Sequence, residues 1–319
     1  MFCFDHALVR HAFYGRQGLT RRSRLHRQIA ERLEAIYARD QRAEVADELG
    51  HHFADAGDWL KAIDYLRIAL QTAKLRFAYR EAQSILDFAA SLTRKLPSDL
   101  RPLKSFEFAE ARASLYAAAH DPRAEAAWIE LEEQARAIGR LDAQLRAMLG
   151  LAYVFSWSDR RRCIEMLDNA LALSASHPDL RVSALVRVSA CVRRIWTDGW
   201  SHADLIECET AMRALRETGD PLLIARANLE YSMLCIISSR YREALGTVRA
   251  NYQILFEHAV EHPGFDLARA TWMLRLGTPW AQLFLGELGR SMESFDQGMA
   301  SFRENGDYFA ARTLEVYRG

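Results

Sequence analysis

Proline is scarce in this chain, with seven residues among 319. Nearly every proline lies in a polar turn segment rather than inside an apolar periodic run. Because proline lacks a backbone N–H and clashes with the preceding helical turn, this distribution favours long, uninterrupted helices.

Cysteine is also infrequent, and its spacing does not suggest pairing. No C-x-x-C and no paired cysteine–histidine spacing occurs among the five cysteines, which are Cys3, Cys163, Cys191, Cys208 and Cys235. Most of them lie within apolar helical patterns. The sequence therefore predicts buried thiols in a reducing compartment rather than disulfides or a structural zinc site.

An excess of one charge sign and long hydrophobic runs are both missing. Forty-two basic residues balance 42 acidic ones, so no global field would attract nucleic acid or an acidic membrane. No apolar run approaches the ~18 residues of a membrane span, and the segment from Met1 to Phe4 lacks the layout of a signal peptide. We expect a folded protein, because 50% of its residues are hydrophobic and can form a core. Since no span or signal peptide is found, we expect it to be cytoplasmic and without membrane association.

The segment from Ala46 to Ala69 has the internal spacing of a helix–turn–helix repeat. A turn at Gly57–Asp58 separates two sets of positions, which are Leu49, Gly50 and Phe53 before it and Ala62, Leu66 and Ala69 after it. This is the L-G-x2-Y…A-x3-F-x2-A pattern of a tetratricopeptide repeat, in which small residues let two helices approach closely. Ala82, Leu86 and Ala89 repeat its second half.

Polar helix starts recur along the second part of the chain. His177-Pro178, Asp220-Pro221 and His262-Pro263 place three prolines 43 and 42 residues apart. Aspartate followed by proline is a favourable helix start, and Gly139, Gly219 and Gly306 are expected C-caps. Two helices fit each period, and the predicted bounds are Leu141 to Phe155, Arg160 to Leu173, Pro221 to Ile237, Tyr241 to Phe256 and a last helix from Tyr308 to Tyr317.

The first part of the chain predicts a different local structure. A short strand at Phe2 to Phe4 leads into a helix, and a second helix runs from Thr20, as its N-cap, to Arg39. Pro97 to Pro102 is expected to break the helical run, and it suggests a hinge. The predicted organisation is an N-terminal segment with a linker helix at 1–40, first repeats at 41–97 and a longer-period segment at 103–319, and the resemblance described next implies that the N-terminal segment is a winged-helix remnant.

Three sequence runs resemble one family. The runs F-x-F-x-H-A-L-V-R-x-A-x-Y from Phe2, R-L-H-R-Q-I-A from Arg24 and L-x-H-H-F-x-x-A-G-D from Leu49 are similar to a consecutive stretch of bacterial signal-transduction ATPases with numerous domains. In that family the stretch joins a winged-helix segment to a tetratricopeptide superhelix. The similarity is most specific over about the first ninety residues and is at the level of repeats beyond them.

The resemblance implies an all-α fold, with a right-handed tetratricopeptide-like α-solenoid of antiparallel helix pairs after a small winged-helix remnant. It implies a sensor or scaffold arm that binds a protein partner or a small inducer in a concave groove and signals to an ATPase core in cis. The output would be transcriptional or cyclase-associated. The chain has no G-x4-G-K-[ST] motif, so ATP binding does not carry over. We expect a C-terminal fragment, a truncated reading frame or a stand-alone descendant, and a stand-alone adaptor is the alternative function.

No motif indicates catalysis. G-x-S-x-G, H-E-x-x-H and glycine-rich phosphate loops are missing from the sequence, so we expect neither an enzyme nor a cofactor. Asp47, His51 and Asp55 lie at steps of four and could hold a divalent ion, but a solvated helix face with i,i+4 pairs is the favoured interpretation. His6 and His11 are expected to pack structurally.

A basic segment at the N-terminus raises a third hypothesis. Only Asp5 and Glu31 oppose its seven arginines, which are Arg10, Arg16, Arg21, Arg22, Arg24, Arg27 and Arg32. Clustered arginines can neutralise nucleic-acid phosphates. Without interleaved aromatic residues or a recognition-helix pattern, a solvated helix face or a contact with an ATPase core is favoured.

Tryptophans near the ends of the predicted first helices complete the candidate residues. Core packing between repeats is the default interpretation of Trp157, Trp196, Trp200 and Trp280. Alternatively, helical register turns three arginines toward a concave groove, where they would bind an anionic or sugar-like ligand or an acidic peptide. The predicted groove site comprises Arg193, Arg194, Trp196, Trp200, Arg226 and Trp280.

Overall fold

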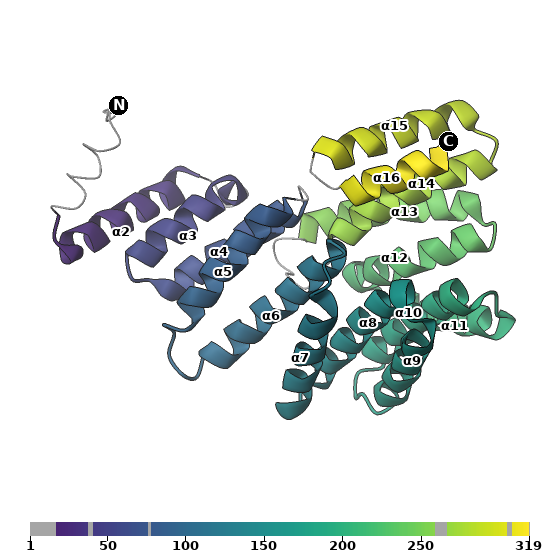
Figure 1. Ribbon diagram of the computed structural model, residues 1–319, viewed down its shortest axis with the longest axis horizontal. Helices are drawn as coiled ribbons and strands as arrows, with labels where there is room; N and C mark the ends of the chain where they lie inside the picture. Colours follow the sequence, from purple (N-terminus) through teal and green to yellow (C-terminus); the bar gives the residue numbers. More distant parts are fainter. Residues whose placement is uncertain (1–16, 38–40, 76–77, 259–266, 305–307, 319) are drawn as a thin grey trace. The chain divides into compact units, whose positions relative to one another are not determined.

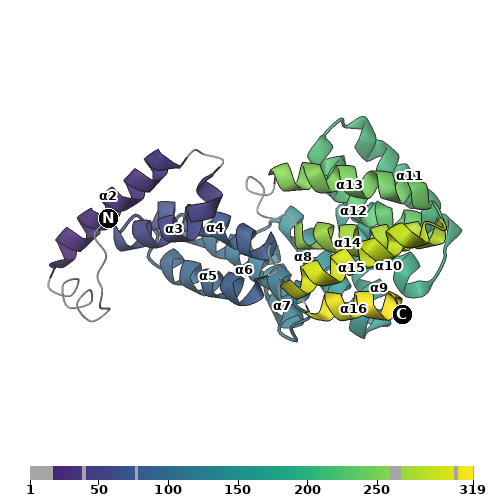
Figure 2. The ribbon, with the colours of Figure 1, turned by 90° about the horizontal axis from the view of Figure 1, so that it is seen from above.

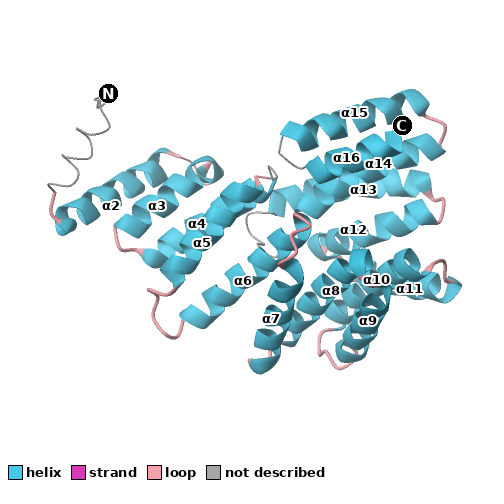
Figure 3. Ribbon diagram, in the orientation of Figure 1, coloured by secondary structure: helices cyan, strands magenta, loops and turns pink. Residues whose placement is uncertain are grey.

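The computed structural model describes residues 17–37, 41–75, 78–258, 267–304 and 308–318. Within these residues the regular elements are fifteen α-helices and one 3-10 helix, with no strand (Figures 1 and 3). The all-α prediction is confirmed. The strand predicted at Phe2 to Phe4 and the first sixteen residues of the segment predicted to be a winged-helix remnant lie outside the described residues. The chain divides into two compact units, Met1–Ala73 with Glu81–Ser105 and Lys74–Arg80 with Phe106–Gly319.

Unit 1 contains the segment that the sequence predicts to form tetratricopeptide-like repeats. Its helices are α2 (Leu19–Ile36), η1 (Arg42–Val45), α3 (Ala46–Asp55), α4 (Trp59–Leu75) and α5 (Tyr79–Thr93), the last two extending a few residues beyond the unit. All the predicted repeat positions are buried, namely Leu49, Gly50, Phe53, Ala62, Leu66, Ala69, Ala82, Leu86 and Ala89. The spacing of small and large residues therefore marks the packed faces of these helices correctly.

Gly50 shows why a small residue is needed between α3 and α4. A Cβ atom built on Gly50 would lie 2.8 Å from Leu66 Cδ2 and 3.5 Å from the Ala62 carbonyl oxygen. Real Cβ atoms do not approach other atoms as closely as the first of these distances, so only glycine allows this helix contact without displacement. The predicted close approach between Gly50 and Ala62 is confirmed.

Unit 2 is a series of helix pairs. It includes Phe106 onward of α6 (Arg101–Ala118), and its other helices are α7 (Ala124–Ala137), α8 (Leu141–Ser158), α9 (Arg160–Ser174), α10 (Leu180–Asp198), α11 (His202–Glu217), α12 (Pro221–Ile237), α13 (Tyr241–His258), α14 (Leu267–Phe284), α15 (Leu288–Glu304) and α16 (Tyr308–Arg318). Helices α8, α10, α12 and α14 each pack on the following helix and also contact one another in succession. Figures 1 and 2 both show α13, α14 and α15 side by side. This pattern is that of a helical solenoid.

The helix starts agree only partly with the predictions. Asp220 caps α12 by accepting hydrogen bonds from the backbone N–H groups of Leu222 and Leu223, both at 3.0 Å, and Pro221 is the first helical residue, as predicted. In α10 the cap is Asp179 rather than His177-Pro178, because the Asp179 carboxylate accepts the Arg181 N–H at 2.9 Å.

Three other helix ends test the sequence predictions. Gly139 and Gly219 adopt left-handed φ angles of 68° and 67° after α7 and α11, as expected of helix C-caps. Thr20 is not a cap, since α2 begins at Leu19 after Gly18 and has no side-chain cap. Pro102 lies in the first turn of α6, where a missing N–H costs nothing. The break predicted from Pro97 to Pro102 therefore ends earlier, at Leu100.

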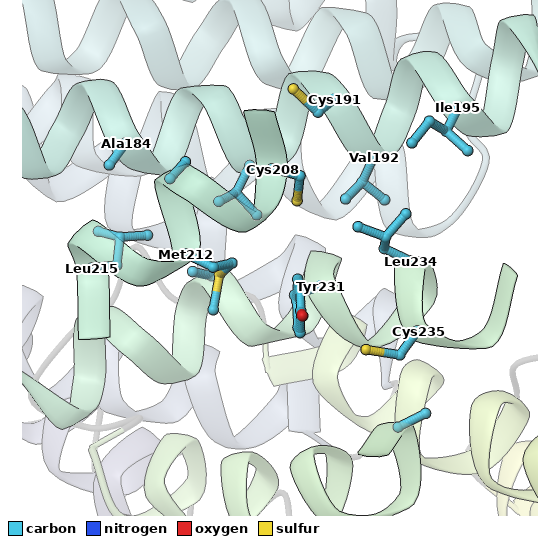
Figure 4. Close-up of a cluster of buried hydrophobic side chains, with 14 of the residues drawn as sticks. Ala184, Cys191, Val192, Ile195, Cys208, Met212, Leu215, Tyr231, Leu234 and Cys235 are labelled. Carbon is cyan, nitrogen blue, oxygen red and sulfur yellow. The ribbon is translucent and has the colours of Figure 1, made fainter. Parts of the chain in front are cut away.

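One core cluster of unit 2 buries three of the cysteines. Cys191, Cys208 and Cys235 come from α10, α11 and α12 and lie among aliphatic side chains (Figure 4). Burial raises the pKa of both Cys191 and Cys235 to about 12, so these thiols stay protonated at neutral pH. Cys163 is also buried and free, so the prediction of buried free thiols is confirmed for the four described cysteines. No described helix is both long and apolar enough to cross a bilayer.

Candidate functional site

A surface pocket of about 380 Å³ lies in unit 2, where the turn after α10 meets the turn after α12. This volume falls within the range typical of small-molecule sites. Apolar side chains and hydrogen-bonding groups both line it, and they are Trp200, Leu205, Glu209, Ile237, Ser238, Ser239 and Arg240. One of the predicted site residues, Trp200, therefore lies in a pocket.

The turn between α10 and α11 positions Trp200 in the lining of the pocket. Helix α10 ends at Asp198, and Gly199 follows with φ at 102°, a left-handed value that glycine adopts without strain. Ser201 then caps α11 by accepting a hydrogen bond from the Asp204 N–H at 3.2 Å. Between these two fixed residues, Trp200 stays 53% exposed.

The turn between α12 and α13 also lines the pocket, through Ser238, Ser239 and Arg240. Ser238 donates a hydrogen bond from Oγ to the Leu234 carbonyl oxygen at 2.7 Å, which satisfies a carbonyl at the end of α12. Ser239 has a φ of 61°, an unusual left-handed conformation for a residue other than glycine. This compact turn directs Arg240 toward α11.

Arg240 organises the polar side of the pocket. Its Nη1 donates hydrogen bonds to Glu209 Oε1 at 2.9 Å and to the Tyr231 hydroxyl at 3.1 Å. Its Nε donates to Ser238 Oγ at 3.0 Å, whereas Nη2 is buried and has no hydrogen-bond partner within the described part of the chain. The pocket thus combines apolar walls with a paired carboxylate and guanidinium, while the unsatisfied Nη2 itself is covered by the protein.

Tyr231 contacts Arg240 through both its ring and its hydroxyl group. Arg216 and Arg240 lie over its ring at 5.2 and 5.3 Å from the centroid. Burial raises the pKa of the Tyr231 hydroxyl, so it remains a neutral acceptor for Arg240. The Arg240 guanidinium is therefore held by Glu209 on α11 and by Tyr231 on α12.

Arg193 and Arg194 are adjacent in sequence but have different partners. Arg193 is buried, with Nη2 3.3 Å from Glu230 Oε1 on α12 and its guanidinium 5.1 Å from the ring centroid of Tyr153 on α8. Arg194 pairs instead with Asp168 on α9 and with Asp204 on α11. These two arginines join neighbouring helices. A charge reversal at Arg193 would leave Glu230 facing a like charge, so it would test folding as much as binding.

The other predicted residues are dispersed. Arg226 on α12 is half-buried, and burial together with the nearby Arg146 lowers its pKa. Trp280 packs against two core clusters and meets Tyr317 edge-on with 4.5 Å between the ring centroids. Trp196 is 41% exposed on α10. The core-packing interpretation therefore holds for Trp280 and is wrong for Trp196, Trp200 and the half-exposed Trp157.

Sequence reasoning missed Arg240, Glu209 and the serines of the pocket. Glu209 lies in the middle of α11, where a charged residue signals only a solvated helix face. A usable signal was present at the turns, because Trp157, Trp200, Tyr241 and Phe284 recur at steps of 43, 41 and 43 residues. That period is the length of a helix pair, and the four residues lie near successive turns, within α8, after α10, at the start of α13 and at the end of α14.

The metal hypothesis fails on geometry. His51 Nε2 pairs with Asp47 Oδ1 at 3.8 Å, as expected for an i,i+4 pair, but Asp55 faces His26 on α2 at 3.6 Å. Among the residues that the structure places, no group of three or more histidine, cysteine, aspartate or glutamate side chains could hold an ion. In the basic segment, Arg27 faces Asp58 at 3.8 Å, while Arg10 and Arg16 lie outside the described residues.

Comparison with known proteins gives no identification, since no family model matches the chain and no curated protein is similar enough to match it.

Proposed function

We propose that this chain is a non-catalytic recognition module whose second unit binds a protein partner or a small inducer at the pocket between Trp200 and Arg240. The observation that carries this proposal is the pocket itself. An exposed indole, that of Trp200, and a hydrogen-bonded guanidinium, that of Arg240, line it together. Binding sites commonly combine apolar walls with a few well-placed polar groups.

The chemistry of the pocket favours binding over catalysis. Its one carboxylate and one guanidinium, Glu209 and Arg240, are already paired with each other. Neither a histidine nor a cysteine is among the described residues that line it. Such a site can orient a ligand through charge-assisted hydrogen bonds, whereas proton transfer needs a base that is free to accept a proton.

We further propose that the module serves as the sensor or scaffold arm of a bacterial signal-transduction ATPase or transcriptional regulator. Support comes from the sequence runs at Arg24 and Leu49, the second of which occupies α3 and the turn after it. In that role, binding in unit 2 would be passed to an ATPase core in cis.

Thermal unfolding tests the binding role. The full chain is heated with members of a panel of sugars, nucleotides, amino acids and organic acids. A ligand at a hundred times its Kd stabilises the folded state by about 2.7 kcal/mol, which raises the Tm by several degrees. We expect this rise to disappear in Trp200→Ala and Arg240→Gln and to persist in Leu180→Ala, a control at the other end of α10 that is 80% exposed. An equal rise in all variants would show that binding occurs elsewhere.

A further inference from the structure

Helix α2 turns one face away from the other helices of unit 1. Its opposite face packs on α3, where His26 meets His52 and Ala30 is buried. Figures 1 and 2 show α2 as the outermost described helix of the unit. At about 100° per residue, several exposed side chains fall within about 140° on the free side of the helix. We call five of them the basic face of α2, namely Arg21, Arg24, Ile29, Arg32 and Ile36.

The basic face carries charges that no described carboxylate pairs with. Its three arginines form neither a hydrogen bond nor an ion pair with any described residue. Arg27, on the flank of the helix, pairs by contrast with Asp58 at 3.8 Å. Beside the arginines, Ile29 and Ile36 are 43% and 61% exposed. A basic helix with exposed apolar positions is typical of an element that binds an acidic partner.

Helix α7 in unit 2 presents the complementary chemistry. It contains four glutamates against one arginine. Two of these glutamates, Glu130 and Glu133, are exposed and form no ion pair within the described residues. Ile129 beside them is 37% exposed, and Ala126 and Ala137 are the small exposed residues on the same side. We call these five residues the acidic face of α7.

The charges of the two faces have the same spacing. Arg21 and Arg24 are three residues apart, as are Glu130 and Glu133, so each pair rises about 4.5 Å along its helix. Two helices in contact can therefore bring both arginines against both glutamates at once. Hydrogen bonds between guanidinium and carboxylate are strong because both partners are charged. The alanines of the acidic face let a second helix approach closely.

Charge also decides between the possible occupants of the basic face. Two basic faces repel each other, so α2 does not suit a second α2. A nucleic-acid strand needs a continuous surplus of positive charge, whereas isoleucines lie among these arginines and the whole chain has 42 basic and 42 acidic residues. The acidic face of α7 supplies both carboxylates and an apolar residue. A second copy of the chain therefore carries a surface that fits α2.

We propose that the basic face of α2 docks on the acidic face of α7 in a second copy of this chain. Each copy carries both faces, so the contact is heterologous and continues head to tail or closes into a ring. Helix α7 has 14 residues and is about 21 Å long, so the contact is small for a specific interface and the association is weak. Neither face lines the pocket at Trp200 and Arg240, so this association does not depend on the proposed function.

Sedimentation velocity of the full chain measures the association. We expect the average mass to rise with concentration between about 1 and about 200 µM, as mass action requires of a weak complex. Arg21→Glu with Arg24→Glu, and separately Glu130→Lys with Glu133→Lys, should each weaken the association at least about tenfold, because like charges then face each other. An equimolar mixture of these two double variants should associate like the wild type, since each reversed face then meets a reversed face.

The matched control reverses two other exposed arginines, by Arg213→Glu with Arg242→Glu. These arginines likewise form no ion pair with a described residue. The control changes the net charge by the same amount as the α2 double variant and should associate like the wild type. Wild-type association should also weaken as salt rises from about 0.05 M to about 0.5 M, because salt screens exposed charges. Circular dichroism should show the same helix content in every variant.

Three results would overturn the inference. The first is a wild-type chain that stays monomeric over the whole concentration range. The second is a mixture of the two double variants that fails to associate, because the two faces then do not meet each other. The third is binding of a DNA duplex to a monomeric chain that Arg21→Glu with Arg24→Glu abolishes, because nucleic acid would then occupy the basic face.

Discussion

A close contact between two histidines holds α2 against α3. The Nδ1 atoms of His26 and His52 lie 2.7 Å apart, a distance at which one imidazole N–H donates a hydrogen bond to the bare nitrogen of the other. Their other ring nitrogens face Asp55 at 3.6 Å and Glu48 at 3.7 Å. When both rings carry a proton on Nδ1 this hydrogen bond is lost, and two positive charges face each other.

The histidine pair should make unit 1 sensitive to mild acid. Burial and the facing His26 lower the pKa of His52, in spite of Glu48 and Asp55, below its usual value of about 6.5. The folded state then binds fewer protons than the unfolded chain. The stability of unit 1 should therefore be complete above about pH 6.5 and fall as the pH drops below that value. Urea unfolding at pH 7.5 and pH 5.0, followed by NMR signals of α2 and α3, measures this loss.

His52→Gln provides the control for this prediction, because glutamine keeps a polar side chain but does not titrate. We expect the variant to lose part of the difference in stability between the two pH values. A wild-type stability that is equal at both values would show that the pair does not sense protonation.

At the scale of helices, four successive starts in unit 2 use a side-chain cap. Asp159, Asp179, Ser201 and Asp220 accept backbone N–H groups at the starts of α9, α10, α11 and α12. Each cap satisfies donors that an isolated helix leaves without partners. These caps fix where each helix begins and thus which residues form the turns between the helices.

Replacing the cap of α12 should destabilise unit 2 modestly. Asp220→Ala removes the acceptor of two backbone hydrogen bonds, and the loss of such a cap typically costs about 1 kcal/mol. Asp220→Ser keeps an oxygen acceptor and should retain most of the stability. Urea denaturation measures both variants, and equal losses in the two would mean that the carboxylate acts by some means other than capping.

At the scale of the whole molecule, the division into two units predicts that damage to one leaves the other folded. Gly50→Leu would drive a side chain into Leu66 between α3 and α4, and overpacking of this kind typically costs about 1–3 kcal/mol or more. We expect faster hydrogen exchange across α3 and α4, with little change across α8 to α13. Hydrogen-exchange mass spectrometry of the full chain measures both regions.

The matched control is Gly246→Leu on α13, because a Cβ atom at Gly246 meets no atom within 4 Å. This variant should exchange like the wild type throughout the described helices. Uniformly faster exchange across both units in Gly50→Leu would show that the chain unfolds as one cooperative unit.

The features that the sequence determined are local ones. Both ends of α12 were predicted correctly, since Pro221 and Ile237 are bounded by a cap and a turn whose chemistry acts within a few residues. The buried set Ala62, Leu66 and Ala69 was also predicted, because spacing along one helix defines one face. Capping, turn chemistry and helical periodicity depend only on neighbours in the chain.

The tertiary structure decided which of these faces meet. Sequence register grouped Arg193 with Arg194, whereas packing buries the first against α12 and pairs the second with α9 and α11. It likewise brought Trp200 and Arg240, forty positions apart, to one pocket. Burial and pairing of a side chain depend on contacts between distant segments, and a single sequence gives no direct record of those contacts.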